Sequence, residues 1–170
     1  MHYNTQDAFL RAGFDLVRQY DPETYERMTR DKWLVSTDFD EIFGLARDVN
    51  SGQRLSDDFG AWFTVQAAYG ATVSDANPTV VAPEPLVYIN RDSIERWASK
   101  AGVNPAAVTA STLVHEYEHT HESDMDETAA FRAGSAFAAK LPGRDGVEIK
   151  RMSDTVMASL RNGQYAWRDV

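Results

Sequence analysis

A helix with a clear beginning occupies the second half of the chain. Asn104 can cap its start, and Pro105 suits the first helical position, where a missing N–H costs nothing. The helix predicted from this start covers residues 105–121. Three of the chain's four histidines lie in its last seven positions, and His115 and His119 are four residues apart. Side chains at that spacing share one helix face, one turn apart, so both imidazoles face the same surroundings.

The sequence His115-Glu116-Tyr117-Glu118-His119 has the spacing of a zinc site. Two imidazole nitrogens one turn apart can bind one Zn²⁺ at ~2.0–2.1 Å without distorting the backbone. Glu116 lies about 100° round the helix from His115, where its carboxylate can reach a metal-bound water without being a ligand. The pattern therefore predicts Zn²⁺ at His115 and His119, with Glu116 as general base. The alternative is a solvated helix face rich in Glu and His.

A catalytic zinc ion usually has three protein ligands and one open position for water. His121 is two positions beyond His119, so on a continuous helix it points to the opposite side. A metzincin would need glycine at position 122 and histidine or aspartate at position 125, and this chain has Glu122 and Met125 there. That class is excluded. The acidic residues left as candidates for the third ligand are Asp124, Asp126 and Glu127.

Periodicity favours Glu127 as the third ligand. Glu127 shares a helix face with Phe131 and Gly134, at the head of the apolar stripe of a helix predicted over residues 128–140. A carboxylate at the head of such a stripe needs a partner, because burying it bare is costly, and zinc would be that partner. In the alternative, Asp124 caps this helix and Glu127 is its reciprocal capping residue. Asp124 and Asp126 therefore stay open as ligands.

Residues 108–141 resemble the gluzincin metallopeptidases. The resemblance is carried by the histidine motif and by the run Asp-Glu-Thr-Ala-Ala-Phe-Arg from Asp126 to Arg132. The second run looks like that of the compact minimal gluzincins, which include the ImmA/IrrE-like peptidases, where a second helix carries a glutamate ligand followed by small residues and an aromatic. The resemblance implies a zincin-like metalloprotease core, a Zn²⁺ cofactor held by His115, His119 and Glu127, and an endopeptidase acting on a protein or peptide.

The chemistry expected of such a site is metal-assisted hydrolysis of an amide bond. Zinc lowers the pKa of its bound water towards ~7 and polarises the scissile carbonyl. Glu116 takes the proton from that water and passes it to the leaving amine. The developing oxyanion needs a further donor, for which the candidates are Tyr88, Tyr165, His121 and Arg132. Two other functions stay open: a non-enzymatic zincin-fold module stabilised by zinc, and a zinc hydrolase acting on a non-peptide substrate.

The rest of the sequence predicts an α+β fold dominated by helices, in one domain over residues 1–170 with a small sheet. Apolar spacing and caps predict further helices over 5–20, 23–29, 40–47, 93–101 and 147–160. Aromatic and β-branched runs predict strands over 61–67 and 86–89, while residues 70–85, with Gly, Asn, Pro and Asp, are expected to form a loop. By analogy with zincins, either strand is expected to offer its edge to an extended substrate.

Charge and cysteine content narrow the partners. A net charge of −9 repels phosphate backbones, so nucleic acid is not an expected partner. Cysteine is absent, so any metal must be held by nitrogen and oxygen ligands. The N-terminus lacks the pattern of a secretory signal, and no stretch reaches the ~20 apolar residues of a membrane helix. We therefore expect a cytoplasmic protein with no membrane partner. A secreted enzyme with a trimmed leader, or a protein delivered into another cell, fits too, and the oligomeric state is open.

Overall fold

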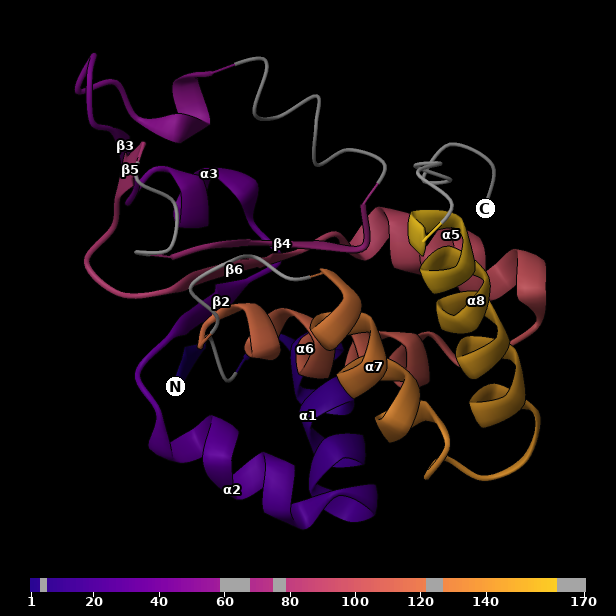
Figure 1. Cartoon of the computed structure of the whole chain (residues 1–170). Coiled ribbons are helices and arrows are strands. Elements are labelled where there is room, and N and C mark those ends of the chain that lie inside the picture. The colour runs from indigo at the N-terminus through magenta and orange to yellow at the C-terminus, as the bar shows by residue number, and fades with distance from the viewer. Residues whose placement is uncertain (4–5, 59–67, 75–78, 122–126, 162–170) are drawn as a thin grey trace.

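The computed structural model describes residues 1–3, 6–58, 68–74, 79–121 and 127–161, and most of its regular structure is helical (Figure 1). The α+β, helix-dominated fold expected from the sequence is confirmed. The described helices are α1 (Ala8–Tyr20), α2 (Pro22–Arg30), α3 (Phe39–Phe43), α5 (Arg91–Ala101), α6 (Pro105–His119), α7 (Glu127–Ala138) and α8 (Gly143–Arg161), with a short 3-10 helix at Leu55–Asp57.

The main sheet has four strands in the order β1-β2-β6-β4. The strands of the structure are β1 (His2–Tyr3), β2 (Leu34–Ser36), β3 (Arg47–Asp48), β4 (Gly70–Val73), β5 (Val80–Val81) and β6 (Leu86–Ile89). β1, β2 and β6 run parallel, whereas β4 runs antiparallel to β6, with Thr72 opposite Val87. β3 and β5 form a separate antiparallel pair. Among the described residues, β4 ends the main sheet and pairs on one side only.

The two faces of the main sheet are covered differently (Figure 1). Helices α1, α2, α6 and α7 lie on one side and the short α3 lies on the other. Side chains of β6 alternate between the two sides: Val87 and Ile89 join the large cluster around α1 and α6, while Leu86 joins a smaller cluster with Ile42 and Phe43 of α3.

Helix α6 runs through the large cluster, so its first turns are buried on nearly every face. Ala107, Val108, Ala110 and Leu113 are each at most 2% exposed. The predicted start of this helix is confirmed, because the side-chain oxygen of Asn104 accepts a hydrogen bond from the backbone N–H of Ala106 at 3.0 Å. The second half of α6, which carries the histidines, is therefore held at a fixed place against the sheet and α7.

The structure differs from the sequence prediction in the sheet. Residues 70–85, expected as a loop, contain β4 and β5. The strand over 86–89 is confirmed as β6, but it lies between β2 and β4, so it has no free edge for a substrate. The helix expected over 40–47 ends at Phe43. The strand expected over 61–67 lies outside the described residues. No described helix is both long and apolar enough to cross a membrane.

Candidate metal centre

His115 and His119 lie one turn apart on the face of α6 that meets α7. Their ring centroids are 5.0 Å apart, and the side chains are 12% and 3% exposed, respectively. Phe131 of α7 packs edge-on against His115, with 4.5 Å between the ring centroids. The predicted pairing of the two histidines on one helix face is confirmed, and their packing limits how far either imidazole can rotate.

A close approach of α7 to α6 brings its first turn within reach of the histidines. The hydroxyl of Ser111 on α6 donates a hydrogen bond to the carbonyl oxygen of Gly134 on α7 at 3.2 Å. A Cβ atom at Gly134 would lie 3.3 Å from the carbonyl oxygen of Ser111 and 3.5 Å from Cβ of His115. The helices can pack this closely because Gly134 has no side chain. Glu127 is about two turns earlier on the same helix, and so on the same face.

Glu127 is the third member of the cluster. Its Oε2 atom lies 3.6 Å from Nε2 of His115 and 3.7 Å from Nε2 of His119. One ligand atom from each of the three residues can be chosen so that all lie within 4.8 Å of one another. Ligand atoms held about 2.0–2.2 Å from a tetrahedral ion are about 3.3–3.6 Å apart. The two distances from Oε2 of Glu127 are therefore close to those between the ligands of a zinc site. Asp124 and Asp126, the alternative ligands, lie outside the described residues.

The surroundings of Glu127 also suit a cation. Its Oε2 atom is buried and has no hydrogen-bond partner among the residues that the structure describes. Burial raises the pKa of Glu127, but the two neighbouring imidazoles lower it to about 2, so the carboxylate is charged at neutral pH. A buried anionic oxygen without a hydrogen bond is costly, and a metal ion would satisfy it. Two imidazoles and one carboxylate are a donor set that binds Zn²⁺ and leaves a fourth position for water.

Glu116 lies beside the cluster but points to the sheet. Its side chain is 6% exposed, and its Oε1 atom lies 4.0 Å from Nε2 of His115. Its Oε2 atom accepts a hydrogen bond of 2.7 Å from the hydroxyl of Thr72 on β4. Burial raises the pKa of Glu116, and the nearby histidines and the Thr72 hydrogen bond oppose that rise only in part. The carboxylate is thus next to the cluster, as a general base must be.

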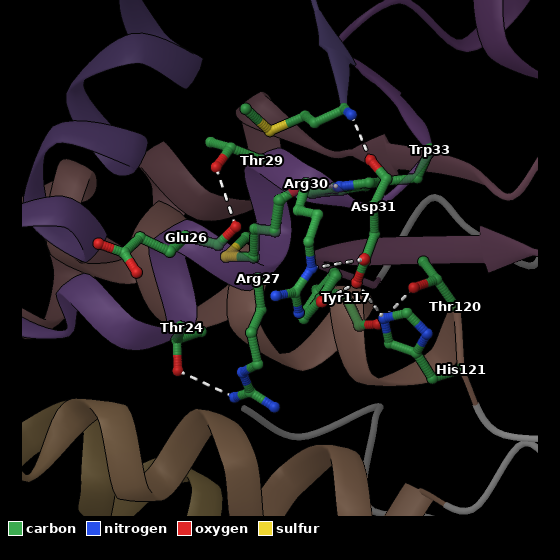
Figure 2. Close-up of polar contacts among 12 residues, drawn as sticks. Thr24, Glu26, Arg27, Thr29, Arg30, Asp31, Trp33, Tyr117, Thr120 and His121 are labelled. Carbon is green, nitrogen blue, oxygen red and sulfur yellow. Dashed lines mark hydrogen bonds and ion pairs between the residues drawn. The ribbon is translucent and has the colours of Figure 1, made fainter.

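Figure 2 shows the opposite side of α6, where Tyr117 and His121 point to Asp31, just after α2. The hydroxyl of Tyr117 donates a hydrogen bond to Asp31, and Nε2 of His121 lies 3.1 Å from Oδ2 of Asp31. Nε of Arg30 is 3.7 Å from the other carboxylate oxygen. The prediction that His121 points away from His115 and His119 is confirmed.

Of the four candidates for an oxyanion donor, the structure describes Tyr88, His121 and Arg132. Tyr88 packs on the far side of the sheet with Phe39 and Phe43, at centroid distances of 5.7 and 6.1 Å, so this candidate does not lie at the cluster. The cause is strand alternation, which turns Tyr88 away from α6. His121 is engaged with Asp31, Arg132 is exposed on α7, and Tyr165 lies outside the described residues.

Sequence reasoning missed two residues on β4 that contact Glu116, namely Gly70 and Thr72. Both lie in the segment expected to form a loop because it contains Gly, Asn, Pro and Asp. The short β-branched pair Thr72-Val73 was the one local sign of a strand.

Comparison with known protein families, with curated proteins and with solved structures finds no match to this chain.

Proposed function

We propose that this protein is a zinc-dependent metallopeptidase of the gluzincin type, an endopeptidase that hydrolyses peptide bonds in a protein or peptide. One observation carries the proposal: Oε2 of Glu127 lies 3.6 Å from Nε2 of His115 and 3.7 Å from Nε2 of His119, and ligand atoms of the three residues lie within 4.8 Å of one another. The carboxylate of Glu116 beside them separates a catalytic site from a structural one, because a zinc ion that only stabilises a fold does not need it.

The proposed roles follow from position. His115, His119 and Glu127 hold the metal and leave one position open. Zinc bound there would supply an acidic water molecule and polarise the scissile carbonyl. Glu116 accepts a proton from the attacking water and delivers it to the leaving amine. Burial raises the pKa of Glu116, which makes its carboxylate a stronger base toward the attacking water.

Strand β4 gives an extended substrate a place beside this site. Among the described residues it is the last strand of the main sheet, and its Thr72 contacts Glu116 of α6 directly. A peptide that adds to this edge gains backbone hydrogen bonds and is oriented along the strand. We propose the edge of β4 in place of the edge of β6, because β6 is paired on both sides.

The first test is the metal content of the purified protein, measured by elemental mass spectrometry for the wild type, His115→Ala, Glu127→Ala and Glu116→Gln. We expect about one zinc per chain in the wild type and in Glu116→Gln, and loss of zinc from the other two variants. Hydrolysis of a peptide library should be present in the wild type and absent from Glu116→Gln.

The outcomes separate the alternatives. Zinc retained in Glu127→Ala would move the third ligand to Asp124 or Asp126. Bound zinc without peptide hydrolysis, with Glu116→Gln indistinguishable from wild type, would indicate a zinc-stabilised module. Hydrolysis of esters or other amides but not peptides would indicate a different zinc hydrolase. If no sample binds zinc even after its addition, the proposal fails.

A further inference from the structure

Two residues of strand β4, Gly70 and Thr72, face Glu116 in the second half of α6. Successive side chains of a strand point to opposite faces, so residues 70 and 72 share the face toward α6. Val73 and Ala71 belong to the other face, where they pack in the small cluster around α3. The α6-facing residues of β4 therefore define the surroundings of the Glu116 carboxylate.

Thr72 contacts one oxygen of that carboxylate. Its hydroxyl donates a hydrogen bond to Oε2 of Glu116 at 2.7 Å and also lies 3.1 Å from the backbone carbonyl oxygen of Glu116. Both residues are buried, with Thr72 9% and Glu116 4% exposed. A hydrogen bond to a buried charged group is stronger than one at the surface, so this contact restrains the side chain of Glu116.

Gly70 leaves the space for the rest of the side chain. A Cβ atom built at Gly70 would lie 2.6 Å from Oε1, 2.7 Å from Cγ and 2.8 Å from Cδ of Glu116. These distances are too short for any real contact, so a side chain here would force Glu116 to move. The conformation of Glu116 seen in the structure thus requires glycine at position 70.

We propose that β4 cradles the carboxylate of Glu116, with Thr72 as a positioning residue that holds Oε2 and Gly70 providing the space that Oε1 occupies. The catalytic consequence of this cradle rests on the proposed function, whereas the cradle itself does not. Orientation matters because Oε1 is only 4.0 Å from Nε2 of His115. A small rotation would bring it among the ligand atoms, where Glu116 would compete for the metal instead of accepting a proton from water.

The kinetic test compares Thr72→Val, which keeps the shape and removes the hydroxyl, with Thr72→Ser, which keeps the hydroxyl. We expect Thr72→Val to keep its zinc and its KM but to lose about 10-fold to 100-fold in kcat, because a misaligned base slows the proton transfer. Thr72→Ser should stay within about threefold of the wild type in kcat. Ala71→Ser, on the other face of β4, is the matched control and should resemble the wild type.

Gly70→Ala tests the position of the other carboxylate oxygen of Glu116, Oε1. It should lower kcat at least as much as Thr72→Val while zinc stays bound, because the added methyl displaces Oε1. A kcat within twofold of wild type in Thr72→Val, or an equal loss of kcat in Thr72→Ser, would overturn the positioning role. So would a loss shared by the Ala71→Ser control.

A second measurement does not depend on zinc or on hydrolysis. Urea unfolding of the metal-free protein is followed for Thr72→Val, Glu116→Met and the double variant. If β4 holds the carboxylate, Thr72→Val lowers the unfolding midpoint in the wild type and has a clearly smaller effect when residue 116 has no carboxylate. Equal effects in both backgrounds would refute the cradle. If the wild type binds no zinc or hydrolyses no peptide, the proposed function is refuted. The unfolding measurements on the single and double variants still test the cradle in that case.

Discussion

The two histidines proposed as ligands lie on one face of α6, and Tyr117 and His121, close to them in sequence, lie on the opposite face. His115 and His119 turn to α7, whereas Tyr117 and His121 turn to Asp31 at the end of α2 (Figure 2). The ring of Tyr117 packs against Trp33, with 5.6 Å between the centroids, and only 2% of Tyr117 is exposed. Its neighbours in the motif are proposed to take part in chemistry, whereas Tyr117 itself contributes to the stability of the fold.

This division gives the first prediction. Tyr117→Phe keeps the buried ring and removes the hydroxyl that donates to Asp31. The variant loses a hydrogen bond to the partly exposed carboxylate of Asp31. We therefore expect its free energy of unfolding, measured in urea titrations, to fall by about 1–2 kcal/mol. Zinc affinity should stay within about threefold of wild type, since the metal cluster lies on the other face. A large loss of zinc affinity would show that the two faces are coupled.

Asp21 provides the second prediction, on pH. Its Oδ1 atom accepts from the backbone N–H of Thr24 at 3.4 Å, and its Oδ2 atom accepts from Nζ of Lys140 at 2.6 Å. Burial raises the pKa of Asp21, but the hydrogen bonds from Lys140 and Thr24 lower it by more. The pKa of Asp21 is therefore below the ordinary value of 3.8. A carboxyl group with a lowered pKa stabilises the fold above its ordinary pKa and loses that contribution as pH falls through its folded pKa.

Asp21→Asn isolates this effect because asparagine can still cap α2. Near pH 7, we expect the unfolding free energy of the metal-free wild type to be about 1 kcal/mol higher than that of Asp21→Asn. This difference in unfolding free energy should vanish at a pH well below 3.8. Lys140→Met should give the same pH profile by removing the other partner. A difference that grows as pH falls would contradict the assignment.

Among the elements, the sequence predicts α6 well and β4 poorly, and the reason is physical. The beginning of α6 depends on local contacts, since Asn104 caps the N–H of a residue two positions away. The histidine face follows from the helix period alone. β4 depends instead on pairing with β6 and on packing against Glu116, 44 positions away from Thr72. Contacts at that separation leave no local pattern, so Gly70 and Thr72 could not be assigned to the site.

The packing of α7 on α6 gives the third prediction. Gly134→Ala adds a methyl that meets Ser111 and His115 at 3.3–3.5 Å, and its cost is offset by the helix preference of alanine over glycine, about 1 kcal/mol. Gly134→Val adds more volume than the interface holds, so α7 must move away from α6. Because Glu127 moves with α7, we expect Gly134→Val to weaken zinc binding at least tenfold in chelator competition, and Gly134→Ala to change it little.

Gly13→Ala is the control for general destabilisation. A Cβ atom at Gly13 of α1 would lie 2.7 Å from Cγ2 of Thr109 on α6, in a contact remote from α7. Overpacking there should lower the unfolding free energy by about 1–3 kcal/mol without weakening zinc binding. If Gly13→Ala and Gly134→Val weaken zinc binding equally, the loss follows from stability and not from the position of α7.

For the whole molecule, the metal would connect two consecutive helices, α6 and α7, that pack against different parts of the fold. α6 carries two of the three proposed ligands and Glu116, and it also packs against α1 and the main sheet (Figure 1). α7 carries the third proposed ligand and contacts α6 and α8. A single ion bound by His115, His119 and Glu127 would therefore join the sheet-facing part of the fold to its C-terminal helices, and its binding energy would stabilise the native state as a unit.

The fourth prediction follows from this linkage. A ligand that binds only the native state, present at about 1,000 times its dissociation constant, adds about 4 kcal/mol to the unfolding free energy. For a chain of this size each kcal/mol raises the melting temperature by about 2–4 °C, so zinc added to metal-free protein should raise it by roughly 10 °C. Calorimetry with and without zinc measures the shift.

Two variants are the controls for this shift in melting temperature. His115→Ala should show almost no shift. Glu116→Gln should show the full shift, because Glu116 is proposed to act on water and not to bind the metal. Mg²⁺ should not substitute, since it favours oxygen ligands over imidazole. An equal shift in His115→Ala would mean that zinc binds elsewhere on the molecule.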